Sequence, residues 1–340
     1  SQGINNIIGI EIFGTEKSPI STVLIAILLG IFLGNAFTPR PGFMIGLDFT
    51  QSYILKLGII FLGIRLSFEE LIRFGSIAIP IILICIASVL ILVKLIANRL
   101  KISSKMSYLI AIGTSVCGAT AIVATAPVVQ ARKTEVAYAI ANITLFGILA
   151  MLLYPYFANY YFENDPILTG LFLGTSIHET SQVAAAGLIY DQQFNSPETL
   201  DVATVTKLIR NTFLVILIPL FALLYNRGQN HGSKYSLSGI FPIFVIGFIG
   251  MIFLRNIGDQ VFLSNGDSTK QWIFFIDVIQ ILATTFLTMA MAAVGLSINL
   301  SELRDMGYKP FVVGFISAVT VGIVCIISIH ILNTYFNFFN

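Results

Sequence analysis

The stretch SIAIPIILICIASVLILVKLIA, residues 76–97, carries one charged side chain, Lys94. An α-helix needs about 20 mostly apolar residues to cross a bilayer, so this stretch predicts a membrane-spanning helix. The rest of the chain has the same character, because 56% of its 340 residues are hydrophobic and only 11% are charged. A soluble protein carries about 25% charged residues. The composition therefore excludes a water-soluble protein, a nucleic-acid-binding protein and a disordered chain.

Ten segments of the chain are apolar enough, or nearly so, to cross a membrane as helices. Polar or turn-rich connectors separate them, and none is long enough for a soluble domain. Backbone in lipid must form its hydrogen bonds internally, and nothing here alternates like the strands of a barrel. We therefore expect an all-α polytopic membrane protein with a single integral membrane domain over residues 1–340, and no signal peptide in residues 1–17. The ten segments are 20–37, 51–66, 76–97, 107–131, 135–157, 166–190, 203–225, 240–254, 271–298 and 310–335.

Two of these segments carry polar residues at membrane depth. Segment 107–131 contains GTSVCGAT, residues 113–120, which we call the first box. Segment 166–190 contains GTSIHETSQ, residues 174–182, which we call the second box. Small and polar residues inside a membrane suit backbone that is broken or re-entrant within a protein-lined cavity. The sequence therefore predicts that both segments are interrupted helices.

Three weak internal matches indicate an internal duplication. Gly-Thr-Ser recurs in the two boxes, residues 63–71 match residues 295–303, and residues 142–144 match residues 211–213. Transporters often contain such repeats in inverted orientation. We therefore expect two repeats, over about residues 18–157 and 165–336, although the order of the matched stretches does not fit a simple tandem copy.

The charges of the loops favour an inverted arrangement, because Lys and Arg stay on the cytoplasmic side. If both box segments enter and leave on one side, each matched pair runs in opposite directions. The alternative is ten full crossings with broken helices, for which the loop charges decide little. In the re-entrant arrangement one side holds Arg40, Arg99, Lys101, Lys105, Arg132, Lys133, Arg227, Lys234, Arg304 and Lys309, and the other holds Lys17, Arg73, Arg255 and Lys270.

The two boxes supply the first candidate substrate-binding residues. A helix that starts inside the membrane presents unpaired N–H groups and a partial positive charge, which favour an anion. Hydroxyl groups add donors, and glycine lets a ligand approach the backbone. The alternative is that these small residues only allow close helix packing. The candidates are Gly113, Thr114, Ser115, Cys117, Gly118, Thr120, Gly174, Thr175, Ser176, Thr180 and Ser181.

Cationic side chains inside segment 203–225 supply the second group of candidates. Lys207, Arg210 and Asn211 are spaced three and four residues apart, so they share one helical face. A cation at the centre of a membrane helix costs about 2.5–3.5 kcal/mol by insertion scales. This face predicts an anion-binding wall that points into the protein. The alternative is that Lys207 extends along the helix to reach the interface.

His178, Glu179 and Gln182 lie in the polar part of the second box. His178 and Glu179 predict either proton coupling or a fixed counter-charge to the cations. The three histidines show no metal-ligand spacing, and Cys117 shows no catalytic spacing with a base, so we expect no metal, no cofactor and no enzyme. At the end of segment 51–66, we expect Arg65 to pair with Glu69 at i, i+4.

In this order the motifs resemble the YeiH-like family of bacterial inner-membrane proteins, whose members are often labelled sulfate exporters. The resemblance rests on both boxes, on residues 207–211, and on Gly295-Leu-Ser with Lys309-Pro310, and it covers nearly the whole chain. It implies a fold similar to the bile-acid/sodium symporter and sodium/proton antiporter group. That fold has two inverted repeats, a panel, and a core with broken helices.

We therefore predict a secondary active transporter of a small anion, such as sulfate, sulfite or an organosulfonate, that works by alternating access. We expect a multi-pass protein of the bacterial inner membrane. Its expected partners are the anion, the lipid bilayer and a coupling ion, either a proton or sodium. A homodimer is an open possibility. One alternative is a sodium-coupled organic-anion symporter of the bile-acid type, in which Glu179, Gln182 and backbone carbonyls are sodium ligands. The other is a channel or a membrane sensor.

Overall fold

The computed structural model describes residues 22–37, 41–226, 244–262, 266–298 and 308–336. All regular structure in these ranges is helical, so the prediction of an all-α polytopic membrane protein is confirmed. Within these ranges, seven helices are long and apolar enough to span a bilayer, and two shorter apolar helices accompany them. The seven are Gly42–Arg65, Phe68–Leu100, Thr134–Tyr161, Pro197–Phe221, Phe244–Phe262, Ser268–Ser297 and Tyr308–Thr334.

Several sequence predictions fall wholly or partly outside the described residues. These are the N-terminal residues 1–17, the match of 63–71 with 295–303, and the loop charges Lys17, Arg40, Arg227, Lys234 and Arg304. The inverted repeats therefore stay a prediction.

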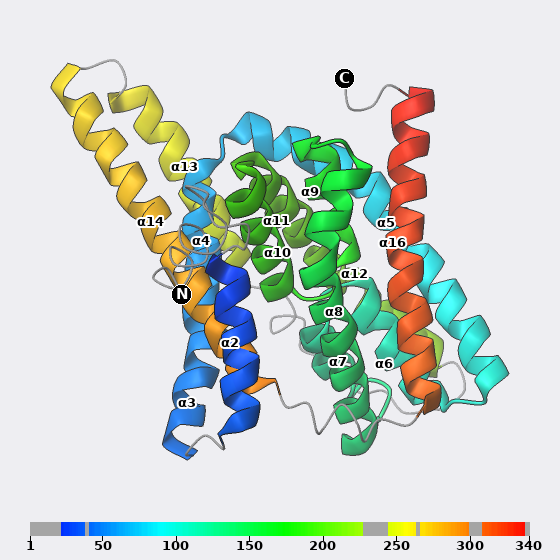
Figure 1. Cartoon of the computed structure of the whole chain (residues 1–340). Helices are drawn as coiled ribbons and strands as arrows, with labels where there is room; N and C mark the ends of the chain where they lie inside the picture. Colours follow the sequence, from blue (N-terminus) through cyan, green and yellow to red (C-terminus); the bar gives the residue numbers. More distant parts are fainter. Residues whose placement is uncertain (1–21, 38–40, 227–243, 263–265, 299–307, 337–340) are drawn as a thin grey trace. The chain divides into compact units, whose positions relative to one another are not determined.

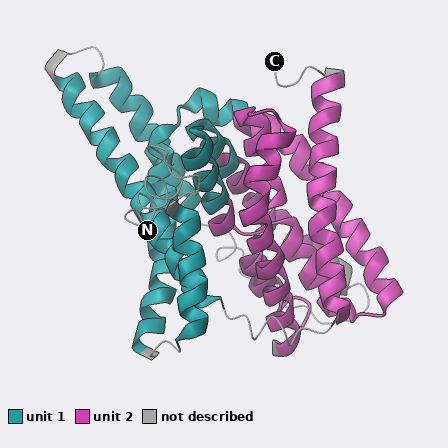
Figure 2. Cartoon of the chain, viewed as in Figure 1, with its two compact units in different colours: residues 1–73, 184–204, 243–300 teal, residues 74–183, 205–242, 301–340 magenta. Residues whose placement is uncertain are grey.

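The chain forms two compact units, and each draws on both halves of the sequence (Figure 2). Unit 1 comprises residues 1–73, 184–204 and 243–300, and unit 2 comprises residues 74–183, 205–242 and 301–340. The chain passes from one unit to the other within α5 (Phe68–Leu100), α10 (Thr180–Phe194) and α11 (Pro197–Thr212).

Unit 1 is built around the pair α2 (Thr22–Ala36) and α14 (Gly266–Ser297). A Cβ added to Gly30 would lie 2.8 Å from the carbonyl oxygen of Ala292, and one added to Gly34 would meet that of Leu296. The absence of side chains at these two positions therefore lets the helices touch backbone to backbone. The unit also contains α3 (Pro41–Phe49), the π-turn Thr50–Ile54, α4 (Leu55–Leu62), the 3₁₀ turn Gly63–Arg65 and α13 (Phe244–Phe262) (Figure 1).

Arg65 does not pair with Glu69, and that prediction was wrong. Its Nε lies 3.0 Å from Asp201 Oδ1, and its guanidinium also donates to the carbonyl of Pro197 at 3.1 Å. The local i, i+4 pair gives way to a partner distant in sequence because Glu69 lies in the first turn of the next helix. That helix, α5, begins with the capping box Ser67-x-x-Glu70, in which the Ser67 N–H donates to Glu70 Oε2 at 2.7 Å.

Unit 2 contains the two interrupted helices. The first consists of α6 (Ser104–Ser115) and α7 (Ala119–Thr125), and the second of α9 (Pro166–Ser176) and the start of α10. Both interruptions fall inside the boxes, as predicted. The rest of the unit is most of α5, α8 (Lys133–Tyr161), the end of α11, α12 (Leu214–Asn226) and α16 (Tyr308–Phe336), with α16 packed on α8 and α9.

Candidate functional site

The first break spans Val116 to Gly118. Gly118 has φ +67° and ψ −129°, a conformation open to glycine and strained for other residues. Its N–H donates to the carbonyl of Gly113 at 3.0 Å, which closes the end of α6. A Cβ at Gly118 would meet the Glu179 side chain, so this glycine permits both the turn and the close approach of the second box.

The second break spans Ile177 to Glu179 and has a different form. Ile177 is extended, with φ −85° and ψ 140°. Glu179 precedes α10, and its N–H donates to Gln182 Oε1 at 3.2 Å, one half of a capping box. The Gln182 amide in turn donates to the carbonyl of Thr144 on α8 at 3.4 Å. The start of α10 is therefore fixed by its own side chains.

Arg210 joins the two breaks. Its Nε donates to the carbonyl of Ser115 at 2.8 Å and its Nη2 to that of Thr114, both at the end of α6. Its Nη1 donates to the carbonyls of Thr175 and Ile177, at the end of α9. The last carbonyls of a helix lack partners within it and carry partial negative charge. One guanidinium thus caps two helix C-termini.

Lys207 completes this cap. Its ammonium donates to the carbonyls of Val116 at 2.8 Å and Ile177 at 3.0 Å, and also to that of His178. An ammonium group has three donors, and here all three bind main-chain carbonyls. Lys207 is 0% and Arg210 1% exposed. The predicted shared, inward face of α11 is therefore confirmed, and extension of Lys207 to an interface is excluded.

These contacts give both cations a role that the sequence did not predict. They bind the ends of two broken helices and hold those ends together. Arg210 uses four hydrogen bonds of the five that a guanidinium can donate. Direct binding of an anion by Lys207 and Arg210 stays a prediction.

Glu179 places a carboxylate at the start of α7. It accepts hydrogen bonds from the N–H of Ala119 and from Thr144 Oγ1, the latter at 3.2 Å. A carboxylate at a helix N-terminus interacts favourably with the helix dipole. The start of the short helix α7 therefore already faces an anion from the protein itself, whereas the sequence predicted that a substrate would lie there.

Several buried polar groups at the breaks have no hydrogen-bond partner among the described residues. The Thr114, Ser115, Thr175 and Ser176 side chains are at most 1% exposed. In a folded protein such groups are nearly always paired, so each unpaired one calls for an explanation. The unpaired atoms at the breaks are Thr114 Oγ1, Ser115 Oγ, Thr175 Oγ1, Ser176 Oγ, both ring nitrogens of His178, and Asn211 Oδ1.

The other predicted residues differ in exposure and in what they contact. A Cβ at Gly113 would lie 2.8 Å from the Ile122 side chain, so this glycine allows close packing, while substrate binding at Gly113 stays a prediction. Thr120 is exposed. Cys117 is half-buried, and its sulfur accepts a hydrogen bond from the N–H of Ala121. Gly174 and Ser181 are buried beside the second break, and Thr180 Oγ1 accepts from Asn211 Nδ2 at 3.0 Å.

The chain matches a family model described as Conserved hypothetical protein 698 over residues 7–314. It is 34% identical over 331 residues to a UPF0324 membrane protein of Fusobacterium nucleatum, covering 94% of this chain and 93% of the relative. The chain belongs to the UPF0324 membrane protein family. A second member, from Streptococcus agalactiae serotype V, is 35% identical over 296 residues, or 87% and 85% of the two chains. The YeiH-like resemblance is thereby confirmed, and no solved structure matches.

The UPF0324 chain also uses a residue that the sequence analysis missed. Thr144 on α8 contacts the second break twice, through its hydroxyl to Glu179 and through its carbonyl to Gln182. Gly147, one turn further along α8, leaves the space in which the Gln182 amide lies. The polar pair Asn142 and Thr144 in the otherwise apolar segment 135–157 was the available signal.

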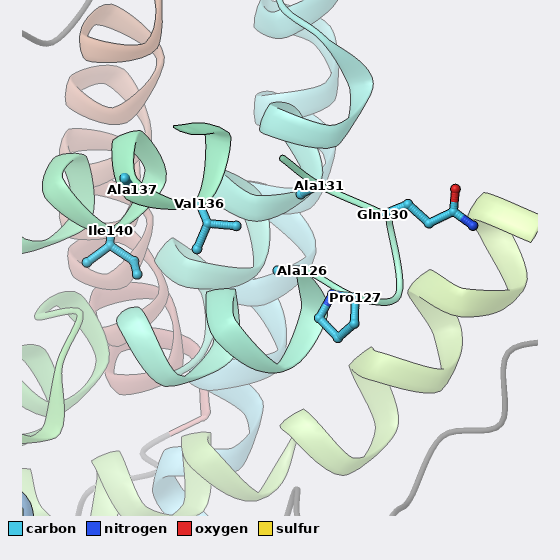
Figure 3. A pocket seen from close by; sticks show the side chains of 7 residues that line it. All are labelled: Ala126, Pro127, Gln130, Ala131, Val136, Ala137 and Ile140. Carbon is cyan, nitrogen blue, oxygen red and sulfur yellow. The ribbon is translucent and has the colours of Figure 1, made fainter. Parts of the chain in front are cut away.

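Two hollows of this UPF0324 protein, of about 440 and 430 Å³, lie away from the breaks. One, of about 440 Å³, is lined by the turn after α7 and by the first turns of α8, and none of the predicted site residues lines it (Figure 3). Among the described residues, no group of three or more His, Cys, Asp or Glu side chains is placed to hold a metal ion. The candidate site is therefore the polar cluster at the breaks.

Proposed function

We propose that this multi-pass membrane protein is a secondary carrier of a small oxyanion, such as sulfate, sulfite or an organosulfonate, in the bacterial inner membrane. The observation that carries the proposal is the pair of helix breaks held by Lys207 and Arg210 and surrounded by unpartnered hydroxyl groups. Discontinuous helices form the substrate sites of many transporters, and alternating access then moves one bundle around that site.

Electrostatics supports an anion as the cargo. Two buried cations and one half-buried carboxylate, Glu179, lie at the breaks. Uncompensated charge at membrane depth is costly, and an anion close to the cations offsets it. The hydroxyls of Thr114, Ser115, Thr175 and Ser176 are the donors that we assign to the oxyanion. The cations act on it through their field and through the fixed positions of these four side chains.

The contacts of Lys207 favour this proposal over a sodium-coupled symporter. Sodium, like other hard cations, is held by oxygen ligands that include backbone carbonyls. In this protein the carbonyls of Val116, Ile177 and His178 already bind the ammonium of Lys207. We therefore propose that transport is independent of sodium, with Lys207 as a built-in cation at the breaks.

His178 is the residue that we propose for proton coupling, with Glu179 as the fixed counter-charge. The imidazole of His178 is 1% exposed and has no partner on either ring nitrogen within the described chain, whereas the Glu179 carboxylate is engaged by two donors. A pH gradient should drive flux in the wild type and no longer do so in His178→Gln. An undiminished response of this variant would contradict the assignment.

We propose transport rather than catalysis for the same site. A cysteine nucleophile needs a base within hydrogen-bonding reach. Cys117 is the candidate nucleophile, and its sulfur binds the N–H of Ala121. Neither ring nitrogen of His178 has a partner in the described residues, so His178 and Cys117 are not hydrogen-bonded to each other, which favours transport over catalysis.

Uptake of labelled sulfate and sulfite into proteoliposomes tests the carrier proposal. The wild type should show saturable flux. Replacing Ser115 and Ser176 together by alanine removes two hydrogen-bond donors, each worth about 1 kcal/mol, so we expect flux at limiting substrate to fall by tenfold or more. Ser317→Ala is the matched control, because Ser317 is equally buried but its hydroxyl binds the carbonyl of Val313 at 2.6 Å.

Three outcomes would overturn the proposal. The first is flux no greater than in empty liposomes. The second is conduction that does not saturate, which indicates a channel. The third is binding without flux, which indicates a sensor. If the double variant has the same flux as the wild type, the hydroxyls of Ser115 and Ser176 do not bind the substrate.

A further inference from the structure

A second feature of unit 2 lies where several helices end. The helix α5 ends at Leu100, α6 begins at Ser104, and α8 begins at Lys133. These are also the ends of the candidate membrane spans Phe68–Leu100 and Thr134–Tyr161. The region therefore lies at the level of the lipid headgroups. The distribution of loop charges predicts that this is the cytoplasmic side.

A polar hollow of about 430 Å³ opens here, lined by Ser103, Ser104, Lys105, Arg132 and Glu135. Its one carboxylate is already engaged, because Glu135 accepts from Ser103 Oγ at 2.6 Å and from the N–H of Arg132 at 2.9 Å. The Arg132 side chain is 77% exposed, and its Nε lies 3.6 Å from Glu135 Oε2. The two cations of the lining therefore face one carboxylate that the backbone and a hydroxyl already bind.

The neighbouring sequence increases the positive charge. Residues 98–105 and 130–135 carry five basic residues and Glu135 as their one acidic residue. The basic residues are Arg99, Lys101, Lys105, Arg132 and Lys133. Clusters of this size next to membrane helices attract anionic lipids, each cation contributing about 1 kcal/mol near the surface.

The hollow of Figure 3 lies next to this polar hollow and has the opposite character. Its lining is mostly aliphatic and comes from the turn after α7 and from Val136, Ala137 and Ile140 on α8, with the Gln130 amide directed away from them. Gln130 lines the apolar hollow, and its carbonyl accepts a hydrogen bond at 2.6 Å from the Nζ of Lys105, which lines the polar one. A single hydrogen bond therefore connects the lining of the apolar hollow to the lining of the basic one.

We propose that these two adjacent hollows bind one anionic phospholipid of the cytoplasmic leaflet. Its phosphate lies in the polar hollow against Lys105 and Arg132, and part of an acyl chain lies along Val136, Ala137 and Ile140. Charge complementarity selects an anionic headgroup, because the lining cations exceed the one engaged carboxylate. The adjoining apolar surface selects a lipid over a free phosphate, which has no group to place there.

Thermal unfolding of delipidated protein in a neutral detergent tests this site. Phosphatidylglycerol should raise the unfolding midpoint by about 2–4 °C, and phosphatidylcholine and inorganic phosphate at equal concentration should not. The variant Lys105→Gln/Arg132→Gln should lose this shift. The matched control Arg99→Gln/Lys101→Gln removes the same charge from residues that line neither hollow, so it weakens only the general attraction to anionic lipid and should keep most of the shift.

A second variant leaves the charges intact. Ala137 is exposed, so Ala137→Trp fills the apolar hollow without entering the packed interior. It should weaken the response to phosphatidylglycerol, and mass spectrometry of the intact protein should detect less retained lipid. The proposal is overturned if Lys105→Gln/Arg132→Gln and Ala137→Trp both respond like the wild type. It is also overturned if phosphatidylcholine or inorganic phosphate gives the same shift.

Discussion

The two helix breaks share a sequence motif but are built differently. Both follow Gly-Thr-Ser, and both end a helix whose last carbonyls bind Arg210 and Lys207. The first turns on Gly118, with a positive φ, whereas the second passes through an extended Ile177. The helix after the first break is capped by Cys117 and by Glu179 from the second box, and the helix after the second is capped by its own Gln182.

This difference makes the first break dependent on the second. The second box supplies the carboxylate for α7 as well as the cap for α10. Changes in the first box should therefore act locally, whereas changes in the second box or in the shared cations should disturb both helices. Four substitutions test this order of dependence, from the largest expected effect to the smallest.

Arg210→Met should be the most damaging, because it acts on both breaks at once. It leaves carbonyls of Thr114, Ser115 and Thr175 without their donor, and each buried unpaired group costs about 1–3 kcal/mol. We expect a loss of at least about 3 kcal/mol, measured by unfolding in detergent. The stability of Arg210→Lys should lie between those of the wild type and Arg210→Met, because lysine keeps the charge but lacks the planar fork of donors.

Arg99→Met is the control for this prediction, since Arg99 is exposed at the end of α5. It should change the free energy of unfolding by less than about 0.5 kcal/mol. Equal stability of the two methionine variants would mean that the cap of Arg210 does not stabilise the fold.

The partners of Arg210 show where prediction from sequence ended. The positions of both breaks were predictable, since Gly, hydroxyl and charged residues interrupt apolar segments there. The inward face of α11 was predictable from the spacing of Lys207 and Arg210 alone. Their partners were not, because every residue has a backbone carbonyl and no sequence pattern marks the ones that a folded helix leaves unpaired. An anion was therefore the natural partner to predict for cations that the structure pairs with the main chain.

Gly118→Ala should have the next largest effect, and it should be confined to the first break. The alanine would occupy a strained conformation, at a cost of about 1–3 kcal/mol, and its Cβ would displace the Glu179 side chain. Gly250→Ala is the matched control, because a Cβ there meets nothing within 4 Å in helix α13. That substitution should be neutral or stabilise the protein by about 0.4–1 kcal/mol. Hydrogen exchange should locate the loss of protection in α7.

Glu179→Gln tests whether the second box supports the first. It removes the charge at the start of α7 while keeping an oxygen that accepts a hydrogen bond, so we expect a loss of about 1 kcal/mol. Amide exchange should rise in α7 more than in α10, since the Gln182 cap of α10 remains. The control Glu163→Gln lies at an exposed position and should have no such effect. Faster exchange confined to α10 would reverse the dependence that we infer.

Cys117 should give the smallest effect, because a sulfur atom is a weak acceptor. Cys117→Ser keeps an acceptor for the N–H of Ala121 and should leave stability within about 0.5 kcal/mol of the wild type. Cys117→Ala removes the acceptor and should be less stable than the serine variant by a few tenths of a kcal/mol or more, the low end of capping effects. Unfolding of the two variants in the same detergent measures the difference. If they are equally stable, the sulfur does not cap α7, and the start of this helix depends on Glu179 alone.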